Sequence, residues 1–143
     1  TYGDLLMKLQ LGTRPYESKK GTTNELYEKW SKRCYKAVAK GSLSEYKKNI
    51  KQIVKDFTDI KWKKKTLAKV GIVGEILIKY HFFGNDNLIE KLEAEGAEVF
   101  LPDLMGFVKY CAYNNVIKEK LLKKGKKTSV FSSIALGLID FYE

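Results

Sequence analysis

The chain has 143 residues, of which 44% are hydrophobic, and it carries a formal net charge of +10. This length lets one domain bury roughly two thirds of its unfolded surface, so folding does not require a disulfide or a metal. No apolar run approaches the ~20 residues of a membrane-spanning helix, so we expect a soluble protein that does not span a membrane.

We expect residues 1 to 66 to form a basic lead-in of three helices. The first is predicted at residues 2 to 11, where Tyr2 and three leucines share one helical stripe. The segment RPYE at residues 14 to 17 then ends this helix with a proline turn.

Two capping boxes predict where the next two helices begin. In such a box a Ser or Thr side chain accepts from the N–H three residues on, while a Glu there reaches back. Thr22 with Glu25 starts the second helix, which should stop at Gly41. Ser42 with Glu45 starts the third. The apolar stripes are Leu26, Tyr27, Trp30, Cys34, Ala37 and Val38 in the second helix, and Tyr46, Ile50, Ile53, Val54 and Phe57 in the third.

A lysine-rich connector follows the third helix. It reads KWKKK at residues 61 to 65, and the composition changes abruptly after it. We therefore place a domain boundary near residue 66, with residues 67 to 143 as the second part. The basicity belongs to the first part, since residues 1 to 70 hold 18 Lys and Arg against 7 Asp and Glu, whereas residues 71 to 143 hold 9 against 10.

The run KVGIVGEILIKYHFFGNDNLIEKLEAEGAEVFLP, which begins at Lys69, predicts a βαβ unit. We expect a central strand formed by Val70, Ile72 and Val73. An Asn or Asp at residues 85 to 87 should cap a helix that ends before Gly96, and a second, parallel strand should follow at residues 97 to 101. The predicted fold class is therefore α/β, with a Rossmann-like βαβ unit of a small parallel sheet behind the helical lead-in.

Two helices are predicted after the second strand. Asp103 caps the first and the tract LLKKGKK closes it, while Thr128 or Ser129 caps the second. The stripes expected to face inward are Leu104, Phe107, Val108, Cys111 and Ala112 in the first helix, and Phe131, Ile134, Ala135, Leu138 and Tyr142 in the second.

The two cysteines, Cys34 and Cys111, lack the spacing of a zinc or redox motif. We expect both to pack as small hydrophobic residues, which is compatible with a reducing compartment and a cytoplasmic location. The chain starts at Thr1 without Met or a signal peptide and stops within an apolar-periodic helix, so we expect it to be a piece of a longer protein.

The carboxyl end of the first strand carries the best candidate site, because open α/β sheets bind ligands there. The candidate ligand or interface residues are Glu75, Tyr80, His81, Asn85 and Asp86. The structural alternative is that these residues cap helices, satisfy backbone amides or pack within the loop. His81 can act as an acid or base near neutral pH, but no Ser or Cys nucleophile is set in register with it, so no catalytic residue is assigned.

Nucleotide and metal motifs are missing from this run. GIVGE at residues 71 to 75 stands in place of GxGxxG, and Gly84 is followed by Asn85 rather than by the lysine of a Walker motif. No metal-ligand spacing is present in the sequence. We therefore predict neither a dinucleotide turn nor a metal site.

The wording of the run also carries a family resemblance. It contains VGIVGE at residues 70 to 75, then Tyr80, Phe83 and Asn85, then EGAEV at residues 95 to 99. In this it resembles the large activase-type proteins of the 2-hydroxyacyl-CoA dehydratase system, in which a BadF/BcrA-type ATPase region precedes a region similar to the dehydratase iron–sulfur subunits. RPYE and the helix predicted after Asp103 are similar to the family too.

The chain departs from the family pattern in two ways. His81 and Phe82 stand where the family often has an Asn-Pro pair, which changes the loop between the tyrosine and the phenylalanine. The cysteines that bind a [4Fe-4S] cluster and the nucleotide motifs of the ATPase have no counterpart. The resemblance therefore implies a cluster and ATP for the parent protein, and no cofactor for this chain.

The resemblance implies a parent in which ATP hydrolysis drives a low-potential electron to an iron–sulfur dehydratase that acts on an acyl-CoA. This chain would be a scaffold or interface domain near a cluster or acyl-CoA site, shaped by Glu75, Tyr80, Asn85 and Asp86, and would not be catalytic alone. Its partners would be the other domains of the parent and the dehydratase subunits, with a homodimer as a further way to cover strand edges.

Two other classes stay open. A nucleic-acid-binding module would pair phosphates with lysines and stack bases on the aromatic residues Tyr27, Trp30, Tyr35, Tyr46 and Trp62. Nucleic acid is the less favoured partner because most of these aromatics lie on or beside predicted apolar stripes and only two cationic residues are arginine. A small-ligand α/β domain or enzyme at the loop would need an acid–base set that the residues do not supply.

Overall fold

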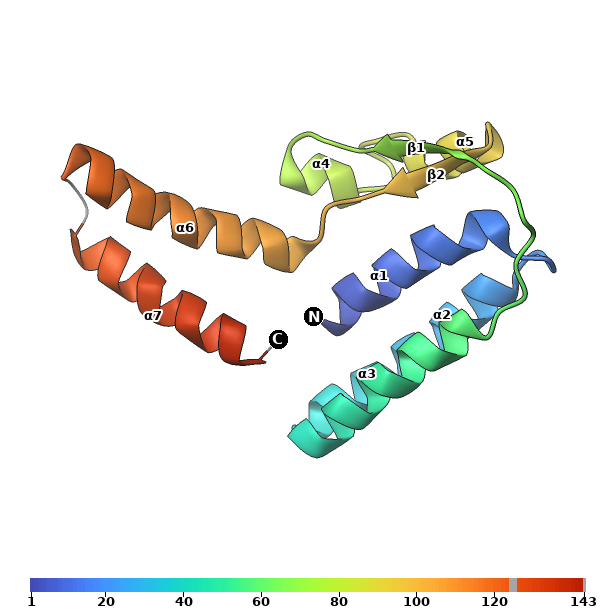
Figure 1. The fold of residues 1–143 in the computed structure, drawn as a ribbon, viewed down its shortest axis with the longest axis horizontal. Helices are drawn as coiled ribbons and strands as arrows, with labels where there is room; N and C mark the ends of the chain where they lie inside the picture. The colour runs from blue at the N-terminus through green and yellow to red at the C-terminus, as the bar shows by residue number, and fades with distance from the viewer. Residues whose placement is uncertain (124–125, 143) are drawn as a thin grey trace. The chain divides into compact units, whose positions relative to one another are not determined.

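The computed structural model describes residues 1–123 and 126–142, which form two compact units, Thr1–Pro102 and Asp103–Glu143 (Figure 1). The first unit contains α1 (Tyr2–Thr13), the 3-10 helix η1 (Arg14–Tyr16), α2 (Thr22–Lys40), α3 (Leu43–Thr58), β1 (Ala68–Gly71), α4 (Ile76–Tyr80), α5 (Leu88–Ala94) and β2 (Ala97–Phe100). The second contains α6 (Leu104–Leu122) and α7 (Lys126–Tyr142). The described residues are mostly helical with a small parallel sheet, which confirms a mixed α/β class.

The helices α1, α2 and α3 pack on one another around an apolar core. The buried members of this core are Tyr2, Leu6, Trp30, Cys34, Ala37, Ile53 and Phe57. The helical stripes predicted for α2 and α3 are thereby confirmed over most of their length. The exceptions are Val38 and Val54, which are exposed.

The start of α2 differs from the predicted capping box. Thr22 is the first helical residue, and its hydroxyl donates to the Lys19 carbonyl at 2.9 Å. The orphan amides are capped from outside the helix, since Glu17 accepts from Gly21 N at 2.6 Å and from Thr23 N at 2.8 Å. The other predicted cap is confirmed, because Ser42 Oγ accepts from Glu45 N at 3.3 Å at the start of α3.

The strands β1 and β2 form a parallel pair, in register from Ala68 opposite Ala97 to Gly71 opposite Phe100. Pairing continues one residue further, where Ile72 N donates to the Phe100 carbonyl at 2.9 Å. A second core cluster of Leu11, Ile72, Val99 and Leu101 lies here, so α1 contributes to both cores of the first unit. Both the predicted helical lead-in and the βαβ unit therefore lie within Thr1–Pro102.

The expectation of a central first strand is wrong for the described residues. Their sheet has only two strands, so β1 and β2 each keep an unpaired edge. Ile72 is buried as predicted, but Val73 lies beyond the last pairing and is exposed. Because β1 pairs only with β2 in the sheet that the structure describes, no second strand covers its other edge.

The second unit is a pair of helices, α6 and α7, that contact each other along their lengths. Asp103 caps α6 by accepting from Gly106 N, as predicted. Helix α7 begins at Lys126, before both predicted caps, so Ser129 lies inside the helix and is buried. Asn115 Nδ2 donates to Ser132 Oγ at 3.2 Å, and Lys109 pairs with Asp140 at 3.0 Å.

The inward stripes predicted for α6 and α7 are mostly wrong. Exposed members of those stripes are Leu104, Phe107, Val108, Cys111, Phe131, Ile134 and Leu138. The buried residues of α7 are instead Ser129, Ser132 and Leu136. Cys111 is therefore no packing residue of this unit, unlike the buried Cys34. The side chains of Thr128 and Tyr142 lie outside the described residues.

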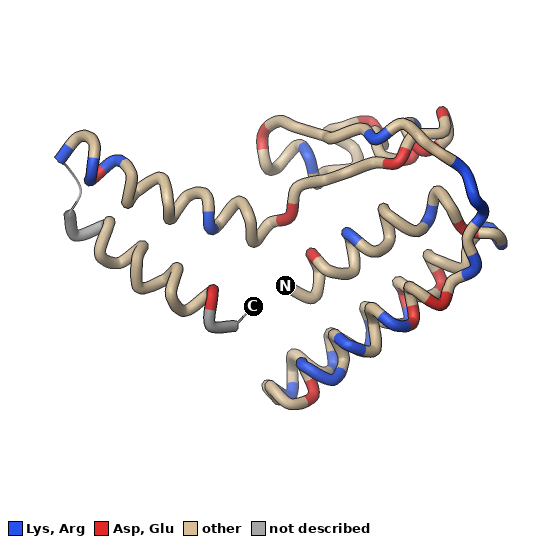
Figure 2. Tube along the Cα trace, in the orientation of Figure 1, with Lys and Arg blue, Asp and Glu red and all other residues tan. Residues whose placement is uncertain are grey.

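The positive charge follows the helical part of the first unit. Figure 2 shows Lys and Arg along α2 and α3 and on the connector that leads from α3 to β1. Among the described residues, no helix has the length and apolar character that spanning a membrane requires.

Candidate functional site

The candidate site is the loop at residues 75–86, which follows the first strand and contains the short helix α4. Glu75 is the N-cap of α4, and its carboxylate accepts from Ile78 N at 3.0 Å. The amides of Leu77 and Ile78 hold the pKa of Glu75 below its ordinary value. The negative charge of Glu75 is thus already stabilised by the backbone amides at the start of α4.

Asn85 joins the end of α4 to the start of α5. Its Nδ2 donates to the carbonyls of Ile78 at 3.1 Å and Lys79 at 3.0 Å, while Oδ1 accepts from Leu88 N at 3.4 Å. Asp86 pairs with Lys91 on α5. Both side chains are therefore used to hold the loop in shape.

His81 and Tyr80 also bond within the first unit. His81 Nδ1 accepts from Gly84 N at 2.9 Å. The Tyr80 hydroxyl donates to the Pro102 carbonyl, and Tyr80 packs against the core cluster of Leu11, Ile72, Val99 and Leu101. The five predicted site residues thus lie in one loop, yet each bonds to a partner within the first unit.

The loop exposes apolar side chains instead. Phe83 is 93% exposed, and the loop's other exposed large apolar residues are Leu77, Ile78 and Phe82. Val73, just before the loop, is exposed as well. This surface at the end of β1, formed by Val73, Leu77, Ile78, Phe82 and Phe83, is called the loop patch below.

A second cluster was missed by the sequence analysis. The Tyr16 ring stacks on Trp62 of the connector, with centroids 5.7 Å apart and planes inclined by 14°. The Tyr16 hydroxyl donates to Glu98 on β2 at 2.6 Å, and this bond raises the pKa of Tyr16. The concentration of hydrogen-bonding side chains in RPYE was the available signal, but the segment was interpreted as a helix stop and as part of the family resemblance, not as a binding cluster.

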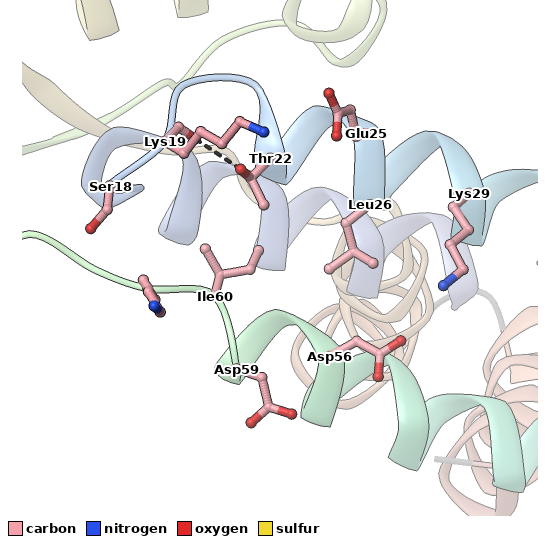
Figure 3. A pocket seen from close by; sticks show the side chains of 10 residues that line it. Ser18, Lys19, Thr22, Glu25, Leu26, Lys29, Asp56, Asp59 and Ile60 are labelled. Atoms are coloured by element: carbon pink, nitrogen blue, oxygen red, sulfur yellow. Dashed lines mark hydrogen bonds between the residues drawn. The ribbon is translucent and has the colours of Figure 1, made fainter.

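Another groove lies between the start of α2 and the end of α3 (Figure 3). Its volume is about 680 Å³, and its lining carries both signs of charge, with Lys19, Lys29 and Lys61 near Glu25, Asp56 and Asp59. The Asp56 carboxylate accepts hydrogen bonds from the indole N–H of Trp30 at 3.0 Å and from Gln52 Nε2. The groove therefore offers no single-sign charge and no acid–base pair.

Metal-ligand geometry is also missing from the part of the chain that the structure describes, where no three His, Cys, Asp or Glu residues come together. Comparisons with protein-family models, with curated proteins and with solved structures give no match to this chain.

Proposed function

We propose that this chain is an interface domain of a 2-hydroxyacyl-CoA dehydratase-activating protein, and that the loop patch is its docking surface. One observation carries the proposal. The polar side chains of the loop bond to the loop and its neighbours, whereas its large apolar side chains point to solvent. Several large apolar residues exposed within one short segment favour a protein partner over a small polar ligand.

The resemblance to the activase-type family also supports the loop patch as the docking surface. The residues that resemble the activase-type family run from β1 through α4 and α5 to β2, so they contain the whole loop patch. A parallel β1–α5–β2 unit with open edges is what a Rossmann-like layer would contribute to a larger sheet. In this proposal Glu75, Tyr80, Asn85 and Asp86 shape the docking loop and do not perform chemistry.

The exposed faces of α6 and α7 are compatible with the proposal. A helix pair with apolar residues on its solvent side needs further protein to cover them. The acyl-CoA, the iron–sulfur cluster and ATP would bind to other parts of the parent or to the dehydratase subunits.

The first experiment is to capture the native protein from its source cells with an antibody against this domain. We expect bound iron and a mass well above the 16.4 kDa of this chain. An iron-free protein of this mass would refute the activase proposal.

A second experiment tests the loop patch by single substitutions introduced into the full-length protein that the first experiment identifies. Phe83→Ser should lower ATP-dependent activation of the dehydratase at least tenfold, because it removes the most exposed side chain of the patch. Leu43→Ser, an exposed apolar residue on α3, is the matched control and should leave activation unchanged. Equal effects of the two variants would overturn the docking role.

A further inference from the structure

The connector between α3 and β1 is held in place rather than loose. Ser18 N donates to the Lys61 carbonyl and Lys63 N donates to the Tyr16 carbonyl, both at 2.8 Å. These bonds make an antiparallel bridge between Glu17 and Trp62. The lysines on either side of Trp62 are therefore presented from a fixed backbone.

Trp62 combines this fixed position with open surface. Its ring stacks on Tyr16, yet the residue remains 54% exposed. Burial of an indole is favourable, so a fixed and half-exposed one leaves stacking surface unused. Such a ring is suited to stack a planar group of a ligand.

The surroundings of this aromatic pair are positive. A groove of about 420 Å³ is lined by Gly12, Tyr16, Trp62, Lys63, Lys64, Lys65, Lys69 and Glu98. Glu98 is the one carboxylate among four lysines, and it is engaged by the Tyr16 hydroxyl at 2.6 Å and by Lys69 at 3.5 Å. Lys65 Nζ lies 6.0 Å from the centre of the Tyr16 ring. Lys63, Lys64 and Lys65, for which the described residues show no ion pair, thus place positive charge beside the stacking surface.

We propose that this groove binds nucleoside phosphates, with the base stacked on Trp62 and the phosphates paired with Lys63, Lys64 and Lys65. The groove volume is within the range of about 300 to 1,000 Å³ that small-molecule sites occupy. Lysines act as point charges without the fork of arginine, so the site reads phosphate charge and a flat ring without selecting one base. A free nucleotide and a nucleotide within a single strand present the same groups.

The protein carries its own reporter for this site. It has two tryptophans, and Trp30 is 1% exposed with its indole N–H bonded to Asp56. Quenching of tryptophan fluorescence by added ligand therefore reports on Trp62. We would titrate the full chain at low salt with ATP, with coenzyme A, with a 12-nucleotide oligo-dT and with tripolyphosphate, which lacks a ring.

We expect saturable quenching by the nucleotides that weakens as salt is raised, and at least fivefold weaker binding of tripolyphosphate measured by competition. Lys64→Gln with Lys65→Gln, which keeps the fluorophore, should weaken binding about tenfold. Trp62→Ala should do the same, and its binding is measured by isothermal titration calorimetry because it lacks the reporter. The controls, Tyr35→Ala and Lys47→Gln with Lys48→Gln, remove an aromatic ring and two lysine charges from exposed positions on α2 and α3 and should bind as the wild type does.

The source of the ligand follows from the same titrations. Binding of oligo-dT at least tenfold tighter per molecule than ATP or coenzyme A assigns a single strand, while equal affinities assign a free nucleotide. Tripolyphosphate binding as tightly as ATP would overturn the proposal, as would equal losses in the site and control variants. Because Trp62→Ala also removes the stack on Tyr16, its fold is checked by circular dichroism. If that variant unfolds, the binding of the variant with Lys64→Gln and Lys65→Gln tests the proposal instead.

Discussion

Arg14, Tyr16 and Glu17 each bond to a different element of the first unit. Arg14 donates to the Glu93 carboxylate on α5 through two nitrogens, at 2.7 and 2.9 Å. Tyr16 reaches Glu98 on β2, and Glu17 caps α2. A segment that ends one helix thus also positions the next helix and the sheet.

Replacing Glu17 should destabilise the first unit through loss of this cap. Glu17→Ala leaves the amides of Gly21 and Thr23 without an acceptor, so we expect the free energy of unfolding to fall by about 1 to 2 kcal/mol. Glu17→Gln keeps one carbonyl acceptor and should lose less. Urea unfolding followed by circular dichroism measures both, and an Ala variant as stable as the wild type would contradict the cap.

The Glu17 cap should also depend on pH. Burial disfavours the Glu17 carboxylate, but the backbone N–H bonds of Thr23 and Gly21 and the charge of Arg14 outweigh burial and hold its pKa below the ordinary 4.5. A lowered folded-state pKa contributes stability above about pH 4.5 that is lost as the pH falls through the folded value. The stability difference between wild type and Glu17→Gln should therefore shrink in acid, and a difference that grows in acid would refute this.

Arg14 and Glu93 form a two-pronged ion pair that is mostly buried, and it should couple the helical lead-in to α5. A double-mutant cycle with Arg14→Ala and Glu93→Ala should give a coupling energy of about 1 to 2 kcal/mol, because the pair is better shielded than a surface salt bridge. Lys40 and Glu45, a more exposed pair 3.9 Å apart, are the control and should couple by less than about 0.5 kcal/mol. Equal coupling in both cycles would contradict the linking role.

At the scale of the elements, α6 and α7 differ most from the sequence-based expectation. Apolar residues occur on more than one side of each helix, so their spacing did not single out the face that packs. The faces that meet instead carry polar contacts, such as Asn115 with Ser132. Hydroxyl and amide groups that bond across the pair occupy positions where the pattern predicted surface.

The orientation of α7 can be tested with two leucines. Leu136 is 7% exposed and Leu138 is 58% exposed, although the sequence analysis placed only Leu138 inward. Leu136→Ala should lower the protection of α7 amides from hydrogen exchange by about 2 to 3 kcal/mol, whereas Leu138→Ala should change it by less than about 0.5 kcal/mol. The reverse order would restore the predicted stripe and refute the observed packing.

The sequence analysis predicted correctly those helix ends and strands that are determined by interactions between residues close together in the sequence. The caps at Ser42 and Asp103, the stop at Gly41 and the parallel pair around Gly96 are encoded within a few residues each. The cap of α2 was missed because its acceptor, Glu17, lies outside the helix and reaches it through a turn. Glu17 is only four and six residues from Gly21 and Thr23, but an acceptor that precedes the helix across a turn does not follow the spacing of a capping box.

For the candidate site, the sequence predicted which polar residues lie in the loop but not how they bond. The polar residues of the loop were found, because they follow a strand in a recognisable βαβ run. Their inward bonding depends on turn geometry, including positive φ angles of 54° at Asp86 and 52° at Asn87, which the spacing does not fix. The groove at Trp62 needed Tyr16 brought beside it, over a sequence distance that no motif covers.

At the scale of the whole molecule, the two units are unequal in what they bury. Thr1–Pro102 contains both core clusters, and α1 belongs to each of them. In Asp103–Glu143 the buried residues of α7 include two serines, while large apolar side chains of both helices are exposed. Chains of about 40 residues rarely bury enough surface to fold alone.

We therefore expect residues 1–102 to fold independently and residues 103–143 not to. The shorter protein should keep a cooperative thermal transition with a midpoint within a few degrees of that of the full chain, because its cores and its linking bonds are intact.

A peptide of residues 103–143 should show weak helicity that rises with concentration, because its exposed apolar faces associate. Circular dichroism of both pieces is the measurement. A residue 1–102 protein without a cooperative transition would mean that the second unit supplies stability to the first, and a monomeric, fully helical 103–143 peptide would mean that its polar contacts suffice.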